Sequence, residues 1–245
     1  MNDKLQQIDT LLGELNQYRA NENYRITEAL EIEYTYDSNR IEGNTLTLHE
    51  TDMVVNKGIT IAGKGLREHL EAINHKEAID FIKDIAQKKE PISERVLLDI
   101  HAIVLHSIDK DNAGKYRRVP VIISGSKHIP PQPYLLQPKM DELFQWYEAN
   151  KDSIHPVVLA AQMHEKLVSV HPFIDGNGRT ARLLMNLILM QHGYPIANIK
   201  GDNETRRRYY ETLEEASSGD NSAFLEFIED VVIQSLTYYL KIIRG

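Results

Sequence analysis

The chain of 245 residues contains no cysteine. Disulfides, thiolate zinc sites and cysteine nucleophiles are therefore excluded. No run of about 18 apolar residues occurs, so we expect no transmembrane helix. The net charge of −8 provides no general basic face for nucleic acid or a membrane surface. The first residues are polar and lack the apolar segment of a secretory signal, so we expect a cytoplasmic protein that binds neither nucleic acid nor membrane.

Basic residues are fewer than acidic ones, 28 against 36, but some of them gather in two short clusters. One contains Lys115, Arg117 and Arg118, and the other occupies 206–208. Charge runs of this kind usually lie on a solvated face of the protein. We predict that position for both clusters.

Apolar residues recur with a period of 3.6 through most of the chain, which predicts helices. The helix predicted at 179–191 is apolar almost all round after its first turn, as in a buried central helix. The length and composition allow one large domain or two small ones. The predicted helices cover 3–19, 26–41, 66–87, 93–106, 136–149, 155–169, 179–191, 204–217 and 221–242.

One segment does not follow the helical pattern. Residues 117–134 (RRVPVIISGSKHIPPQPY) contain a β-branched run, a Ser-Gly-Ser turn and a second extended piece. This pattern predicts a β-hairpin flap closed by prolines. A proline-rich linker within 129–138 is the alternative, but helix-forming sequence resumes on both sides. The predicted fold class is therefore all-α, with one small β-hairpin.

Residues 171–182 (HPFIDGNGRTAR) carry the strongest signal for chemistry. Pro172 disfavours helical backbone at His171, so the preceding helix should end there. The stretch 175–178 contains two glycines and can form tight turns without strain. We expect a helix to begin near Gly178 or Arg179. A glycine-rich turn before a helix N-terminus directs backbone N–H groups at one point and predicts an anion site.

Charged side chains in this segment favour a polyphosphate. Arg179 and Arg182 share a face of the first helical turn, which is the positive end of the helix dipole. An anion makes two cations tolerable there, and arginine can hold phosphate oxygens bidentately. Asp175 is suited to bind Mg²⁺ among phosphates, and His171 to remove a proton from a hydroxyl. Each residue alone has an ordinary structural interpretation, but together they favour a nucleotide site.

This segment resembles the signature of the Fic (AMPylator) family, HPFx[DE]GNGRxxR, at every fixed position. The resemblance extends over roughly residues 30–230. It implies the mainly helical Fic fold and a protein adenylyltransferase, which moves AMP from ATP to a protein Ser, Thr or Tyr hydroxyl and releases pyrophosphate. It also implies N-terminal helices over 1–60 and a catalytic core over 61–245, together forming one compact unit.

The resemblance assigns a role to each matching residue. His171 would be the general base, and Asp175 would hold Mg²⁺, or Mn²⁺, at the α- and β-phosphates. Arg179 would contact the β-phosphate and Arg182 the γ-phosphate. The α- and β-phosphate oxygens would be held by Gly176, Asn177 and Gly178, and the adenine pocket would include Tyr210.

The resemblance also distinguishes branches of the family. In the similar Doc-type branch, which phosphorylates its target, a lysine stands at the position of Gly178, so glycine favours AMP transfer. The flap, through Val121, Ile122 and Ile123, would add a strand to an extended target segment. An ordinary hairpin without that role is the alternative. Relatives imply self-modification and a homodimer as further expectations.

A second motif is SNRIEG at 38–43. Glu42 falls in the last predicted turn of a helix that Gly43 ends, where the helix dipole is negative. Pairing Glu42 with Arg182 would relieve an unfavourable charge at the end of each helix. A surface glutamate before a capping glycine is the alternative interpretation.

SNRIEG resembles the inhibitory motif [ST]xxxE[GN], with Ser38, Glu42 and Gly43 at its fixed positions. The resemblance implies the class with an N-terminal inhibitory helix, in which Glu42 removes the γ-phosphate partner and leaves ATP poorly aligned. In such relatives this glutamate also positions water for removal of AMP, so a deAMPylase is the second hypothesis. A non-enzymatic nucleotide-binding module is the third, but it should lack His171 or Asp175, and neither is missing.

Overall fold

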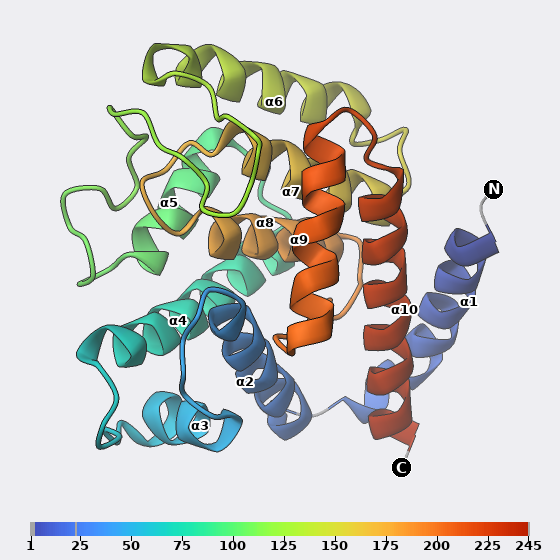
Figure 1. Cartoon of the computed structure of the whole chain (residues 1–245). Coiled ribbons are helices and arrows are strands. Elements are labelled where there is room, and N and C mark those ends of the chain that lie inside the picture. The colour runs from blue at the N-terminus through green and yellow to red at the C-terminus, as the bar shows by residue number, and fades with distance from the viewer. Residues whose placement is uncertain (1–2, 23, 245) are drawn as a thin grey trace.

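The computed structural model describes residues 3–22 and 24–244, and within them every regular element is a helix (Figure 1). Each predicted helix is present, and one more precedes α4. The helices are α1 (Asp3–Tyr18), α2 (Tyr24–Ile41), α3 (Leu48–Lys57), α4 (Leu66–Lys88), α5 (Glu94–Val104), α6 (Leu136–Asn150), α7 (Pro156–Val170), α8 (Asn177–Gln191), α9 (Asn203–Ser217) and α10 (Ser222–Arg244), with 3-10 helices at Arg19–Asn21 and Pro133–Leu135.

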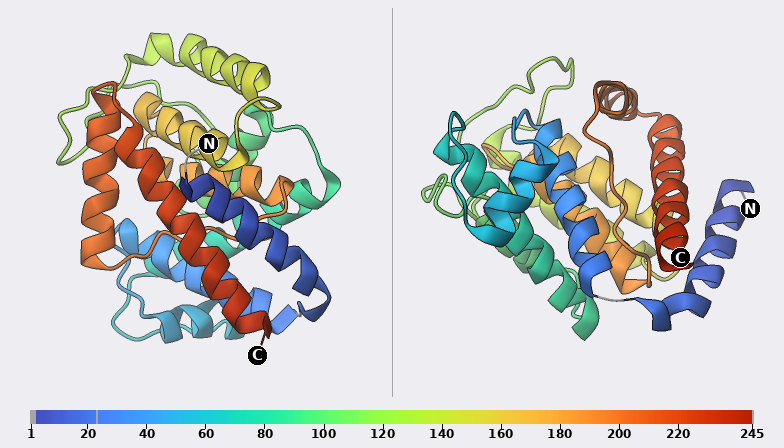
Figure 2. Two further views of the ribbon diagram at one scale, coloured as in Figure 1. Left: turned by 90° about the vertical axis from the view of Figure 1, so that its right-hand side faces the viewer. Right: turned by 90° about the horizontal axis from the view of Figure 1, so that it is seen from below.

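Helix α8 lies at the centre, as its apolar sequence predicted. Helices α7, α4, α5 and α2 contact it, and its residues from Arg179 to Leu189 are all buried. Helices α6, α9 and α10 lie outside this group, and α1 packs along α10 (Figures 1 and 2). Ile8 and Leu15 of α1 belong to the same hydrophobic cluster as α8, so the N-terminal helix shares the main core.

The end of α7 and the start of α8 fix the ends of the loop at 171–176. Helix α7 ends at His171, which has a left-handed backbone with φ of +48°. Helix α8 starts after Gly176, whose φ is +78°. The unpredicted helix α3 is capped at its N-terminus by a capping box of Thr47 and Glu50. That signal was present in the sequence as TLHE.

The predicted β-hairpin is wrong in its secondary structure. Residues 117–134 form an extended excursion with a turn at 124–125, and no strand is assigned in the part of the chain that the structure describes. The prolines at 120, 130, 131 and 133 have no N–H to donate to a ladder. Two carbonyls that could have paired across the arms, those of Val119 and Pro131, instead accept from the side chain of Arg117. We call this segment, 117–134, the flap.

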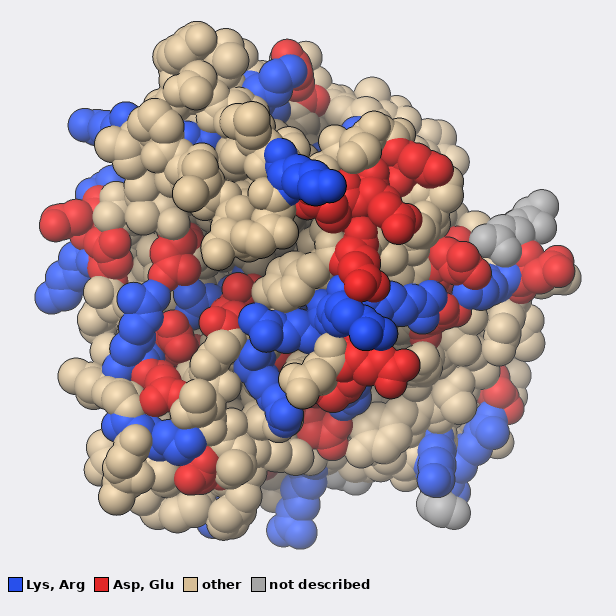
Figure 3. All heavy atoms as spheres, in the orientation of Figure 1, with Lys and Arg blue, Asp and Glu red and all other residues tan. Residues whose placement is uncertain are grey.

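Arg117 also corrects the prediction of a solvated basic cluster, because it is only 3% exposed, whereas Arg118 is exposed. In the second cluster, Arg207 and Arg208 are exposed and pair with acidic neighbours on α9 and α10. Figure 3 shows Lys and Arg gathered near the middle of the face in front of α2 and α9, with acidic side chains around them. Among the described helices, none has the length and apolar character needed to cross a bilayer.

Candidate active site

The segment from the end of α7 into the first turn of α8 (residues 171–178, here the anion loop) is held in part by its own polar groups. The side chain of Asn177 accepts from the N–H of Phe173 at 3.0 Å and donates to its carbonyl at 2.9 Å. Phe173 is fully buried. At Gly176 a side chain would meet a left-handed backbone and the ring of His101 at 3.4 Å, so glycine fits this position best.

His101 from α5 fixes the anion loop by hydrogen bonding and ring stacking. Its Nδ1 accepts from the Gly114 N–H at 3.0 Å, which leaves a hydrogen on Nε2 to donate to the Asp175 carbonyl at 3.0 Å. The ring stacks on Phe173, with centroids 3.6 Å apart. Burial lowers the pKa of His101 to about 4, so the ring is neutral at pH 7. Sequence reasoning missed His101, because a histidine in an apolar helix carries no distinct signal.

Asp175 is an ionised, partly exposed carboxylate surrounded by cations. Its Oδ1 accepts from the Gly176 N–H at 2.6 Å and from Arg179 at 3.3 Å, and its Oδ2 accepts from Arg67 of α4. Burial alone would raise the pKa of Asp175, but the charges of Arg179 and Arg67 and the Gly176 N–H lower it overall.

The carboxylate of Asp175 fits one kind of metal site. No cluster of three or more His, Asp or Glu side chains that could hold a metal exists among the described residues. An all-protein metal cage is therefore not built here. A single ionised carboxylate does fit a divalent ion whose other ligands are phosphate oxygens and water. Such an ion would have to displace the guanidinium of Arg67.

Arg179 lies 2% exposed behind the loop. It contacts Asp175 and also Glu71 of α4, whose Oε1 is 3.4 Å away. Its buried Nε has no hydrogen-bond partner within the described residues. Buried donors are normally satisfied, so this unpartnered Nε is a candidate contact for an anion at the start of α8.

Arg182 is buried more deeply, and four of its five N–H donors are engaged. Its Nε donates to Ser38 Oγ at 3.0 Å, and its Nη2 donates to the Ser38 carbonyl at 2.8 Å and to Glu42 Oε1 at 2.7 Å. Its Nη1 donates to the Tyr209 hydroxyl at 3.3 Å. The ion pair expected between Glu42 and Arg182 is therefore present, and it ties α2 to α8.

Glu42 also sits directly over the start of α8. A Cβ atom added at Gly178 would lie 3.0 Å from Arg182 Nη1 and closer still to Glu42 Oε1. Gly43, with φ of +99°, turns the chain away immediately afterwards. The absence of a side chain at Gly178 is thus what lets the Glu42 carboxylate approach the anion loop.

His171 completes the cluster at the other end of the loop. Burial lowers the pKa of its imidazole below the usual value, and the nearby charge of Arg117 acts in the same direction. The ring is therefore neutral at pH 7 and able to accept a proton. The carbonyl of His171 accepts from Arg117 at 2.9 Å.

The remaining predicted residues lie at the rim. Tyr210 donates to the carbonyl of Ile41 at 3.2 Å and is 42% exposed, so it borders the end of α2. In the flap, Ile122 is 91% exposed, whereas Val121 and Ile123 are half-buried.

The structure thus gathers the predicted loop residues and the SNRIEG residues in one place. Sequence reasoning missed Arg67, Glu71 and Arg117, because their roles depend on neighbours far along the chain.

Comparison with known proteins gives this site a context. The model of the Fic/DOC family matches residues 91–189. A curated protein named protein adenylyltransferase Fic, from Nematostella vectensis, is 39% identical over 210 residues, which is 85% of this chain and 48% of that protein. The chain therefore spans about half the length of the curated relatives it matches.

Solved structures agree in fold over almost the whole chain. Fic-1 from C. elegans superposes with a TM-score of 0.86 at 33% identity, covering 98% of this chain and 71% of that one. A Fic domain containing signaling protein from Bacteroides thetaiotaomicron superposes with a TM-score of 0.88 at 29% identity, covering 99% of this chain and 97% of that one. The chain belongs to the Fic/DOC family.

Proposed function

We propose that this chain is a protein adenylyltransferase, which transfers AMP from ATP to a hydroxyl of a protein substrate. The observation that carries the proposal is the convergence of three groups on one loop. These are the neutral imidazole of His171, the ionised carboxylate of Asp175 and the unpartnered buried donor of Arg179. Relatives that match 85% of the chain bear the name of this activity.

The transfer follows from this arrangement. His171 accepts the proton of the target hydroxyl while the hydroxyl oxygen bonds to the α-phosphorus. The bond from that phosphorus to the oxygen shared with the β-phosphate breaks, and pyrophosphate leaves. Arg179 and the N–H groups at the start of α8 stabilise the leaving phosphates, so positioning and charge supply most of the rate. When bound at Asp175, Mg²⁺ or Mn²⁺ supplies further positive charge to the phosphates.

The contacts refine two of the proposed phosphate ligands. The amide of Asn177 is occupied by Phe173, so Asn177 serves the phosphates through its backbone N–H. Gly178 does the same, and its absent side chain leaves room for the phosphate tail once Glu42 has moved away. The N–H of Gly176 is donated to Asp175 and would have to leave that carboxylate before it binds a phosphate. Arg182 can reach the γ-phosphate only after it releases Glu42.

We propose that the ion pair between Glu42 and Arg182 holds the chain in a self-inhibited state. Arg182 is 1% exposed, and both N–H donors of its Nη2 are taken by Ser38 and Glu42, so Nη2 has none left for a γ-phosphate. ATP bound without that contact would be misaligned, and a small misplacement can cost about 100-fold in rate.

Removal of AMP from a modified protein is the second candidate function. It is favoured by the place of Glu42, whose Oε1 lies over Gly178 beside the loop that would hold the α-phosphate. A carboxylate there can orient a water for hydrolysis of the AMP ester.

Further parts of the proposal concern the partners. The substrate offers a Ser, Thr or Tyr hydroxyl, and its extended segment docks on the flap at Val121 to Ile123, where the 91% exposed Ile122 supports an apolar contact. Tyr210 borders the adenine.

Self-modification, a homodimer and a cytoplasmic location are part of the same proposal. The shared hydrophobic cluster of α1, α2 and α8 supports one unit made of the helices over 1–60 and the core over 61–245.

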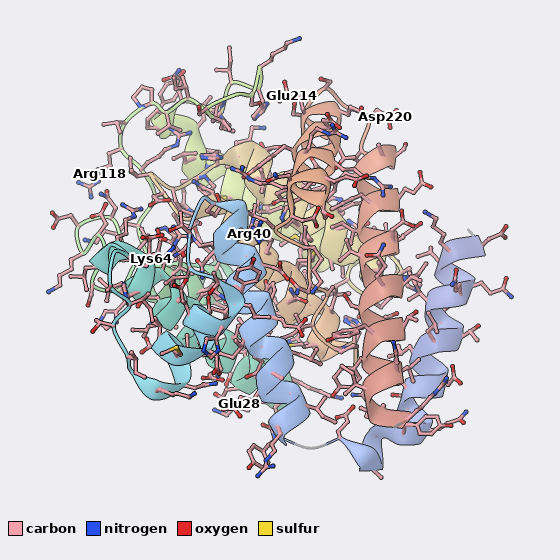
Figure 4. All side chains as sticks on the ribbon, turned by 60° about the horizontal axis from the view of Figure 1, so that its bottom comes forward. Glu28, Arg40, Lys64, Arg118, Glu214 and Asp220 are labelled. Carbon is pink, nitrogen blue, oxygen red and sulfur yellow. The ribbon has the colours of Figure 1, made fainter. Side chains whose placement is uncertain are left out.

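The test is transfer of label from α-³²P-ATP with Mg²⁺ in a cell lysate. The variants are wild type, Glu42→Gly and Glu42→Gly/His171→Ala, with Glu28→Ala as a control at the exposed, opposite end of α2 (Figure 4). We expect strong labelling of protein by Glu42→Gly and almost none by the double variant. Label from γ-³²P-ATP alone would instead show a kinase, and silence with both labels would contradict transfer. Slower release of AMP from labelled protein by Glu42→Gly would support the second function.

A further inference from the structure

A buried arginine connects the flap to the residue at the end of α7. Arg117 begins the flap, and its backbone N–H donates to the Pro172 carbonyl at 2.9 Å. Its side chain donates from Nε to the His171 carbonyl at 2.9 Å, from Nη1 to Val119 at 3.0 Å and from Nη2 to Pro131 at 2.6 Å. Val119 and Pro131 stand on opposite arms of the flap. One guanidinium therefore holds both arms and the backbone of His171.

The surroundings of Arg117 are unusual for a charged side chain. It is 3% exposed, and no carboxylate lies within ion-pair distance among the described residues. A buried charge is costly unless its hydrogen bonds are well satisfied, and here neutral carbonyls alone satisfy them. The planar guanidinium suits this task, because its donors point in fixed directions toward three acceptors. A lysine could not reach all three at once.

The residues just after the turn of the flap have their own attachment. Ser126 Oγ and the Lys127 N–H both donate to Glu214 of α9, the latter at 2.8 Å. The ring of His128 is hydrogen-bonded to the Ser169 carbonyl, at 2.7 Å, in the last turn of α7. Figure 4 shows Glu214 beside the flap and Arg118 directed away from the core. The exposed Ile122 thus lies between two fixed points.

We propose that Arg117 is a positioning residue that couples the target-docking flap to the catalytic base. Any shift of either flap arm is transmitted through the guanidinium to the carbonyl of His171. The backbone of His171 has the left-handed φ of +48°, which few L-residues adopt, so its ring direction depends on contacts that hold it there. The coupling brings a hydroxyl on the docked segment into line with the imidazole. This inference rests on the proposed function and describes how that site receives its substrate.

The test uses Arg117→Lys and Arg117→Met in the Glu42→Gly background, with Arg95→Lys and Arg95→Met, at an exposed position of α5, as matched controls. The acceptor is the protein most strongly labelled in the lysate experiment, purified. Three quantities are measured: kcat and KM for that acceptor, the rate at which ATP is hydrolysed to AMP by water, and the dissociation constant of MgATP. Thermal denaturation reports the folded fraction.

Coupling predicts a specific pattern. Both Arg117 variants lose about 100-fold in kcat, because a base displaced by about 1 Å loses that much. Hydrolysis to AMP falls in parallel, since it needs the base but no docked protein. MgATP affinity stays within about two-fold, and the Arg95 controls resemble the parent. A rise in KM alone, with hydrolysis unchanged, would restrict Arg117 to the flap and overturn the coupling. Equal losses in MgATP binding and thermal stability would show a purely structural role.

The pH profile separates charge from geometry. Since the positive charge of Arg117 lowers the pKa of His171, its removal in Arg117→Met raises that pKa. The base is active only when neutral, so the acid limb of the profile moves to higher pH in Arg117→Met and stays in place in Arg117→Lys. If Arg117→Met yields no folded protein, Arg117→Lys carries the test through kcat and hydrolysis. A Glu42→Gly parent that labels no protein contradicts the proposed function, whereas an active parent with unaffected Arg117 variants contradicts only the coupling.

Discussion

The anion loop and the flap lie side by side in the candidate site, yet they are held in different ways. In the anion loop, Asn177 binds Phe173 only four positions away. In the flap, His128 binds Ser169 and Ser126 binds Glu214, at separations of 41 and 88 positions. The clamp at Asn177 lies within the loop's own sequence, whereas the turn of the flap is fixed by α7 and α9. We infer that the loop is preorganised for the nucleotide and that the flap can adjust to a target.

The largest effect expected from this comparison belongs to Asn177→Ala. The substitution leaves the buried N–H and carbonyl of Phe173 without partners, at about 1–3 kcal/mol for each unsatisfied group. Since the loop positions the α-phosphate, we expect kcat in the Glu42→Gly background to fall by about 100-fold. Label transfer and thermal denaturation measure the two effects. Asn56→Ala, which removes an exposed contact with Asp52, is the control. Transfer at the parent rate would show that this clamp does not organise the loop.

The same contrast explains how much the sequence could predict. The helices and the anion loop follow from local rules, namely apolar periodicity, a proline after His171 and glycines before α8. The pair of Glu42 and Arg182 was also predictable, because two helices each carried a charge unfavourable to its dipole. Helix α3 was missed although its capping box was visible in the sequence.

Longer-range contacts escaped prediction for a physical reason. A β-branched run predicts a strand only if a partner strand is free to pair, and here prolines and Arg117 occupy the polar groups of the flap. Arg117 looked like part of a solvated cluster because its carbonyl acceptors come from residues up to 54 positions away. His101 and Glu71 were missed for the same reason.

A smaller effect is expected where the flap meets α9. Glu214→Gln removes the charge that accepts from Ser126 and Lys127, and the pKa of Glu214 is lowered chiefly by the Ser126 hydrogen bond. The contact is partly exposed and lies at the surface, so its loss should raise KM for the protein acceptor by about five-fold and leave thermal stability unchanged. Glu211→Gln, an exposed residue on the same helix, is the control. No change in KM would mean that docking does not need the tip held, and a fall in MgATP affinity would place Glu214 in the nucleotide site.

The smallest effect is expected at Arg67, which makes an exposed long-range contact with the anion loop. Arg67, 108 positions from Asp175 and 59% exposed, donates to the carboxylate that would hold the divalent ion. The ion must displace this guanidinium, so Arg67→Ala should make binding of ATP more dependent on Mg²⁺. An exposed ion pair contributes little, so we expect the ratio of ATP dissociation constants, in EDTA and in Mg²⁺, to increase about two- to five-fold. Titration calorimetry measures both constants, with Arg95→Ala as an exposed control. A decrease in the ratio would mean that Arg67 binds the metal-bearing phosphates directly, which would add a third distant residue to His101 and Arg117 in supporting the loop.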